Sequence, residues 1–135
     1  MQKAVGAIII AKSTNRILLN KRSCNVTYPN YWGFVGGKVE DFEDTVKTLY
    51  RELHEEIQLD SNLIHSLKEV NVFNSNNKFT YYSFFVFVND EFVPVLNSES
   101  CGYAWISFGN WPQYIHPGAY AVLNEITFED IKKGA

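Results

Sequence analysis

The sequence has little cysteine and no excess of positive charge, and each shortage argues against a class of protein. Its 135 residues contain two cysteines, Cys24 and Cys101, without a CxxC spacing or a histidine cluster beside them. This pattern disfavours both a zinc site and a disulfide framework, and it fits a reducing compartment. The net charge is -3, so no basic field attracts a nucleic-acid backbone. We therefore expect a cytoplasmic protein that does not bind nucleic acid.

Long apolar runs and flexible linkers are missing as well. The apolar run at 4–11 is too short to span a bilayer and lacks the layout of a cleaved signal. No internal repeat, low-complexity segment or linker rich in Pro, Gly and Ser interrupts the chain. We expect one domain over residues 1–135, long enough to bury a core and without a membrane partner.

What the sequence does contain is a series of β-rich runs around two helical stretches. Residues 43–57 lack Gly and Pro and carry apolar residues at helical spacing, and 117–132 show the same periodicity. Ser13-Thr14-Asn15 has turn composition and indicates a hairpin between the first two strands. Strands are predicted at 5–11, 17–21, 32–35, 66–73, 79–88, 92–96 and 103–108. This order predicts an α/β (α+β) fold with helices packed on a mixed β-sheet.

A concentration of acidic residues follows the pair Gly36-Gly37. At 3.6 residues per turn, Glu52, Glu55 and Glu56 share one face of the predicted helix. Glu56 also borders the apolar stripe, which comprises Val46, Leu49, Tyr50, Leu53 and Ile57. Like charges at this spacing repel, so solvent or a cation must offset the repulsion. A solvated acidic face is the common case, but several oxygen ligands beside an apolar stripe favour a site for Mg²⁺ or Mn²⁺.

Three charged residues flank this acidic face. Arg51 stands four residues before Glu55 and eight after Glu43, so it can pair with an acid on the side away from the apolar stripe. Glu43 lies in the predicted first turn, where a negative charge offsets the helix dipole. Glu40 precedes the helix in a loop and has two interpretations, as a ligand that reaches the cation or as an exposed acid.

In this segment the sequence resembles the Nudix hydrolase family. The family signature reads Gly, five residues, Glu, seven residues, Arg-Glu, an aliphatic residue, any residue, Glu-Glu, any residue, Gly and an aliphatic residue. It is matched in register by Gly37, Glu43, Arg51, Glu52, Leu53, Glu55, Glu56 and Leu59. Gln58 replaces the signature glycine, Phe42 stands where glycine is common, and Val35 stands where many members have proline. The resemblance implies the family's α/β/α sandwich, with a mixed β-sheet between helices.

The resemblance also implies roles for the charged residues. Glu52, Glu55 and Glu56 would supply ligands for Mg²⁺ (or Mn²⁺) and the base that activates water. Glu43 and Arg51 would form a structural salt bridge, and we place Glu52, Glu55 and Arg51 in the catalytic set. The metal ligands are expected among Glu52, Glu55, Glu56, Glu40 and Glu99.

The residues expected to bind substrate come from three short segments. By the same resemblance, Gly36-Gly37 would let the backbone approach the metal and a phosphate closely. Lys38 and Arg22 could contact phosphate oxygens, although such cations are commonly solvated. Tyr31 and Trp32 offer flat faces for a nucleotide base, although aromatic residues at strand edges are more often part of the core.

Two downstream residues also have two interpretations. Glu99 lies six residues before Trp105, where some family members supply another carboxylate, and its alternative is an exposed loop acid. His116 precedes Pro117-Gly118 and either starts the last helix or lines the substrate pocket.

The function expected from the resemblance is a metal-dependent pyrophosphohydrolase. Its substrate would be a nucleoside diphosphate linked to another group, such as ADP-ribose, a dinucleoside polyphosphate or FAD. One alternative is a hydrolase of (d)NTPs that acts on the nucleotide pool, and another is a non-catalytic Nudix module that binds a nucleotide. Formation of a homodimer is left open.

Overall fold

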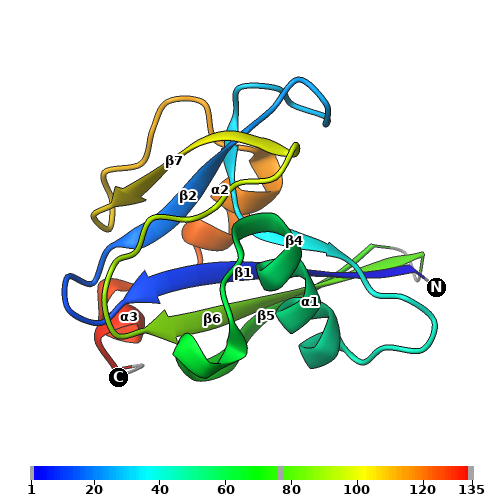
Figure 1. Cartoon of the computed structure of the whole chain (residues 1–135), viewed down its shortest axis with the longest axis horizontal. Helices are drawn as coiled ribbons and strands as arrows, with labels where there is room; N and C mark the ends of the chain where they lie inside the picture. The colour runs from blue at the N-terminus through cyan, green and yellow to red at the C-terminus, as the bar shows by residue number, and fades with distance from the viewer. Residues whose placement is uncertain (1, 76–77, 134–135) are drawn as a thin grey trace.

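A mixed β-sheet organises the computed structural model, which describes residues 2–75 and 78–133. The main strand order is β3-β2-β1-β6-β5, with β4 paired to β1 and β7 paired to β2 (Figure 1). The strands are β1 Gln2–Ala11, β2 Ile17–Arg22, β3 Trp32–Gly33, β4 Val35–Lys38, β5 Ile64–Ser75, β6 Phe79–Val88 and β7 Ser100–Ile106. The helices are α1 Thr45–Ile57, α2 Pro117–Leu123 and α3 Phe128–Lys133, with a short 3-10 turn η1 at Ser61–Leu63.

Strand β1 is central because its sequence is apolar on both faces. It pairs in parallel with β6 along its whole length and antiparallel with both β2 and β4. Ile8 and Ile10 belong to one buried cluster, whereas Val5 and Ile9 belong to the other. A strand of this kind needs cover on both sides. The predicted mixed sheet is thereby confirmed.

Helices cover both faces of the sheet. Leu49, Leu53 and Ile57 of α1 pack in one cluster, and Val122 of α2 and Ile131 of α3 pack in the other. Figure 1 shows α1 crossing the face of the sheet nearer the viewer. The expected α/β/α arrangement is confirmed. No helix in the described part of the chain is long and apolar enough to cross a membrane.

Helix α1 begins two residues later than predicted and buries a different arc of its surface. Asp44 caps it, because its side chain accepts a hydrogen bond of 2.8 Å from the Lys47 N–H. Val46 and Tyr50, expected in the apolar stripe, are 38% and 37% exposed. Instead the buried arc extends to two carboxylates, Glu52 and Glu56.

The end of α1 shows the conformation that Gln58 adopts where the family signature has glycine. Gln58 adopts the left-handed conformation, with φ 54° and ψ 39°, and its N–H bonds to carbonyls of the last turn. Glycine reaches this conformation without a Cβ penalty, so Gln58 takes the position at some cost in strain.

The predicted strand at 92–96 is wrong. This segment runs as a loop, because its backbone bonds to the end of α1 and not to the sheet: Val95 N–H donates to the Ile57 carbonyl and Asn97 N–H to the Glu56 carbonyl. The Trp105 indole N–H also donates to the Phe92 carbonyl, at 3.0 Å. These bonds direct the following residues towards α1. The predicted strand at 32–35 is also divided, into β3 and β4.

The predicted terminal helix is two helices, α2 and α3. His116 caps α2 through its Nδ1, which accepts from the Gly118 N–H at 3.1 Å. A new start follows at Thr127, where the Thr127 N–H donates to Asp130 Oδ2 and the Asp130 N–H donates to Thr127 Oγ1, at 2.8 and 3.2 Å. This reciprocal pair is a capping box, which fixes the start of α3 and interrupts the longer helix.

Replacing Thr127 tests this account of the break. Thr127→Ala removes the cap and should lower the free energy of unfolding by about 1 kcal/mol. Thr127→Ser keeps the hydroxyl and should retain most of the stability. Urea unfolding measures both variants, and equal stability of Thr127→Ala and wild type would contradict the capping role.

Candidate active site

The glycine pair of β4 brings the backbone against two carboxylates of α1. Gly36 N–H donates to Glu56 Oε2 at 3.1 Å. A Cβ on Gly37 would lie 2.3 Å from Glu52 Oε1, and a Cβ on Gly36 would lie 2.1 Å from the Val5 carbonyl oxygen. Both distances are far below van der Waals contact. Gly36 faces backbone and requires glycine for this close approach, whereas a Cβ on Gly37 would displace the Glu52 carboxylate.

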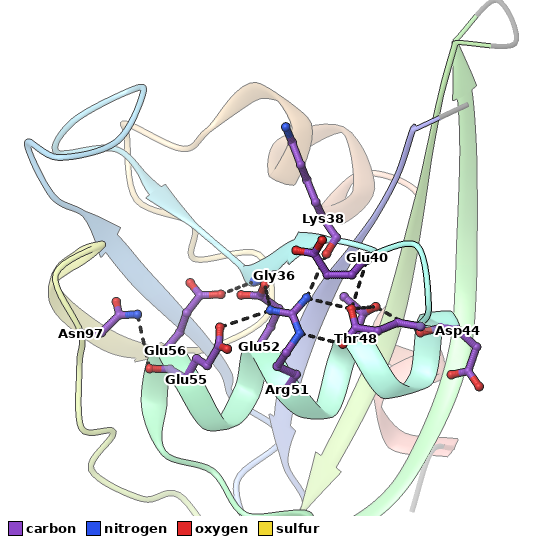
Figure 2. Close-up of polar contacts among 11 residues, drawn as sticks. Gly36, Lys38, Glu40, Asp44, Thr48, Arg51, Glu52, Glu55, Glu56 and Asn97 are labelled. Carbon is purple, nitrogen blue, oxygen red and sulfur yellow. Dashed lines mark hydrogen bonds and ion pairs between the residues drawn. The ribbon is translucent and has the colours of Figure 1, made fainter.

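Three carboxylates converge at this point. Glu52, Glu56 and Glu99 each offer an oxygen, and these atoms lie within 4.8 Å of one another. Glu52 and Glu56 are 8% and 7% exposed, whereas Glu99 is exposed in the loop before β7. Asn97 positions that loop: its amide donates to the Glu55 carbonyl at 3.3 Å (Figure 2), and its Oδ1 accepts from the Glu99 N–H at 2.9 Å.

The carboxylates in this cluster disfavour carrying their charges together. Burial raises the pKa of Glu56, and so do the hydrogen bond and charge of Glu52 and the charge of Glu99. Burial also raises the pKa of Glu52, against opposing effects of the Glu56 hydrogen bond and the Arg51 charge. Such a cluster needs either a proton or a cation. A set of oxygen donors without nitrogen or sulfur fits Mg²⁺ or Mn²⁺.

Arg51 ties the acidic cluster to the preceding loop. Its guanidinium donates to both oxygens of Glu43, at 2.7 and 2.9 Å, and to the Lys38 carbonyl at 3.0 Å. It also donates to Glu52 at 2.9 Å and Glu55 at 3.2 Å (Figure 2). The Arg51 hydrogen bond lowers the pKa of Glu43 to about 2, although burial opposes the shift. The loop between β4 and α1 is therefore fixed at both ends by one side chain.

Two of the expected metal ligands lie outside the cluster. The Glu55 side chain is 53% exposed and pairs with Arg51. Glu40 is exposed, and its backbone N–H donates to Glu43 Oε1 at 3.1 Å. Among the described residues the cluster thus comprises Glu52, Glu56 and Glu99, while Glu40 and Glu55 stay at its margin.

A pocket of about 560 Å³ opens on the other side of β4. Of the expected substrate contacts, Arg22, Gly36, Gly37 and Lys38 line it. Figure 2 shows the Lys38 side chain pointing away from α1. Arg22 is held by the Thr27 carbonyl and hydroxyl, at 2.6 and 2.9 Å. The glycine pair therefore forms a thin wall between the acidic cluster and the pocket.

Tyr31 and Trp32 do not line this pocket. The Tyr31 ring packs edge-on against Tyr28 and Tyr114, with centroids 5.3 and 5.7 Å apart. Trp32 packs on the buried cluster beneath α2 and α3. Trp32 thus contributes to the core, whereas Tyr31 packs on two exposed tyrosines. A contact of either ring with a nucleotide base stays a prediction.

Apart from His116, several residues of the pocket carry no sequence signal. Its apolar wall includes Phe34, Phe79 and Tyr81, and its polar lining includes Asn71, Glu125 and His116. His116 fulfils both interpretations, since it caps α2 and lines the pocket. Burial and the Arg22 charge lower the pKa of His116. These residues meet only because β5, β6 and α2 are adjacent in the fold.

Comparison with known proteins identifies the family. The model of the NUDIX domain matches residues 1–125. The chain belongs to the Nudix family. This confirms the resemblance over 37–59, and with it the reaction class, hydrolysis of phosphoanhydride bonds by a pyrophosphohydrolase.

Two curated relatives act on triphosphates. The dihydroneopterin triphosphate diphosphatase of Haemophilus influenzae is 32% identical over 120 residues, which cover 78% of this chain and 73% of that protein. The 8-oxo-dGTP diphosphatase of Proteus vulgaris is 36% identical over 56 residues, covering 42% of this chain and 50% of that protein.

Solved Nudix structures share the fold at low identity. A MutT NUDIX hydrolase from Burkholderia pseudomallei has a TM-score of 0.72 at 21% identity, covering 93% of this chain and 98% of that one. An Ap4A hydrolase from C. elegans has a TM-score of 0.74 at 20% identity and covers both chains completely. At such identities the likeness supports the fold alone.

Glu56→Gln tests the electrostatics of the cluster. Because the pKa of Glu56 is raised, the folded metal-free protein keeps a proton that the unfolded chain releases above pH 4.5, so stability falls as pH rises above that value. Glu56→Gln should remove this decline and be more stable than wild type at pH 8 by about 1–3 kcal/mol. It should also lose metal-dependent turnover.

Urea unfolding at pH 5 and pH 8, with and without Mg²⁺, measures these effects. Mg²⁺ should stabilise wild type at pH 8 but not Glu56→Gln. The control is Glu69→Gln, at an exposed carboxylate of β5. A pH dependence of stability that Glu56→Gln leaves intact would contradict the electrostatic account.

Gly37→Ala tests the close approach of β4. The new Cβ would displace the Glu52 carboxylate, so we expect half-maximal activity to require about tenfold more Mg²⁺. Gly102→Ala is the control, since its Cβ would meet the Lys21 side chain at an ordinary 3.6 Å. Activity is titrated against Mg²⁺ for both variants. An unchanged Mg²⁺ concentration for half-maximal activity in Gly37→Ala would contradict the role of the close approach between Gly37 and Glu52.

Proposed function

We propose that this chain is a divalent-metal-dependent pyrophosphohydrolase of nucleoside triphosphates and related triphosphates. Water would cleave the bond between the α- and β-phosphates, giving a monophosphate and pyrophosphate. The observation that carries the proposal is the glycine wall, with the Glu52–Glu56–Glu99 cluster on one side and a pocket lined by aromatic rings on the other. A phosphate chain that passes this wall would meet the acidic cluster while its ring stays in the pocket.

The residues divide the work by position. Glu52, Glu56 and Glu99 would hold the cation, which when bound supplies neutralisation of phosphate charge and acidification of water. Glu52 and Glu55 are our choices for accepting the proton of the attacking water. Arg51 keeps both in place through its bonds of 2.9 and 3.2 Å. Lys38 and Arg22, on the pocket side, would contact phosphate oxygens.

A triphosphate substrate is better supported than a dinucleotide or ADP-ribose. Both curated relatives are named for triphosphates, whereas the Ap4A hydrolase is 20% identical and shares the fold only. The rings of dihydroneopterin triphosphate and 8-oxo-dGTP also share one edge, on which an amino group lies beside a ring N–H. The non-catalytic alternative has little support, because every charged position of the signature is present.

A substrate panel tests the proposal. dGTP, dATP, 8-oxo-dGTP, dihydroneopterin triphosphate, ADP-ribose, Ap4A and FAD are incubated with Mg²⁺ or Mn²⁺, and pyrophosphate and monophosphates are measured separately. We expect pyrophosphate release from at least one triphosphate, with kcat/KM at least about tenfold above that for ADP-ribose, Ap4A and FAD. Glu56→Gln serves as the inactive control.

Two results would overturn the proposal. Faster turnover of ADP-ribose, Ap4A or FAD would restore the original expectation of a linked nucleoside diphosphate. Silence on the whole panel, together with thermal stabilisation by a nucleotide, would indicate a binding module.

A further inference from the structure

One row of residues leads across the sheet from the acidic cluster to a polar pair. Gly36 of β4 is the register partner of Gly6, Gly6 is the partner of Ser83 on β6, and Ser83 is the partner of Asn71 on β5. Neighbouring strands are about 4.8 Å apart, so the row spans roughly 14 Å. The row passes beneath the pocket, which both Gly36 and Asn71 line.

The far end of this row is polar. Asn71 of β5 donates a hydrogen bond from its side-chain amide to Glu125 Oε2, in the turn that follows α2. Both residues line the pocket. A carboxylate has two oxygens with about four acceptor positions, so the bond from Asn71 leaves acceptor capacity on Glu125.

A second polar group lies in the same row. Ser83 is fully buried, and its Oγ has no hydrogen-bond partner among the described residues. Tyr81, two residues earlier on the same strand, lines the pocket, so the alternation of side chains puts Ser83 on the same face of the sheet. Because Ser83 has no exposed surface, it belongs to the sheet beneath the pocket and not to the pocket lining.

The walls between the two ends suit a flat ring. Phe34, Phe79 and Tyr81 line the pocket. Gly6 leaves room for the Tyr81 ring, whose hydroxyl takes the place that a Cβ on Gly6 would occupy. Aromatic faces stack on any heterocycle and so do not select one. Selection must therefore come from polar groups at the ring edge.

We propose that Asn71 and Glu125 are specificity-determining residues that select rings with an amino group beside a ring N–H, the edge found in guanine and pterins. A carboxylate accepts from both of these donors at once, whereas adenine presents an acceptor nitrogen beside its amino group and would face Glu125 unfavourably. Asn71 holds the carboxylate through its side-chain amide. This inference rests on the proposed function for the phosphate end of the substrate.

The test compares dGTP with dITP, which differ only by the amino group. Wild type should prefer dGTP by about tenfold, mainly through KM, and Glu125→Gln should abolish the preference by raising KM for dGTP. Glu129→Gln, at an exposed carboxylate of α3, should keep the preference. Asn71→Ala provides a second variant, which should weaken the preference even where Glu125→Gln proves poorly folded.

Calorimetry with dGMP and dIMP separates this inference from the proposed function. Tighter binding of dGMP by wild type and loss of that difference in Glu125→Gln support the inference without any turnover. Equal affinity for the two monophosphates, or a preference that both variants retain, overturns it even if triphosphates are hydrolysed. Absence of hydrolysis together with selective dGMP binding overturns only the proposed function.

Discussion

The burial of two neighbouring carboxyl groups against the glycine pair of β4 is the constraint on which this structure depends. Glu52 and Glu56 leave water to pack beneath Gly36 and Gly37, and a single backbone N–H, that of Gly36, compensates Glu56. Burial and mutual repulsion both favour a proton on the pair. A bound cation would relieve the same conflict, so metal binding would stabilise the folded protein.

Arg51 makes this arrangement tolerable. Its single positive charge bonds to Glu43, Glu52 and Glu55 and to the Lys38 carbonyl, so the loop after β4 cannot move away from α1 without breaking several charge-assisted bonds together. This network fixes the distance between the glycine pair and α1. The sequence spacing from Gly37 to Arg51 therefore determines how the loop packs on the helix, in addition to placing the charged residues.

How much the sequence could predict depended on whether a feature was local. The shared face of Glu52, Glu55 and Glu56 could be predicted from the sequence because each residue of a helix turns by a fixed angle. Other features depend on contacts between segments that are distant in the sequence. These features are the burial of Glu52, the loop conformation of 92–96 and the pocket that Asn71 and Glu125 line. The apolar periodicity of 117–132 also runs across Thr127, so this pattern alone did not reveal the capping box that divides the predicted helix into α2 and α3. Tyr31 and Trp32 were attractive by residue type alone, which does not reveal which face an aromatic ring occupies.

The glycine pair of β4 lies between the acidic cluster and the pocket, so the side chains proposed for cation binding differ from those proposed for ring recognition. The acidic groups that would bind a cation lie on α1 and in the loop before β7, while the groups at the far end of the pocket come from β5, β6 and the α2 region. A substitution at Asn71 or Glu125 thus changes the far end of the pocket and leaves the hydrogen bonds of Arg51 and Gly36 intact. Because the two sets share only the backbone of β4, one fold can keep its chemistry while the ring that it accepts varies. This division is compatible with relatives named for different triphosphates.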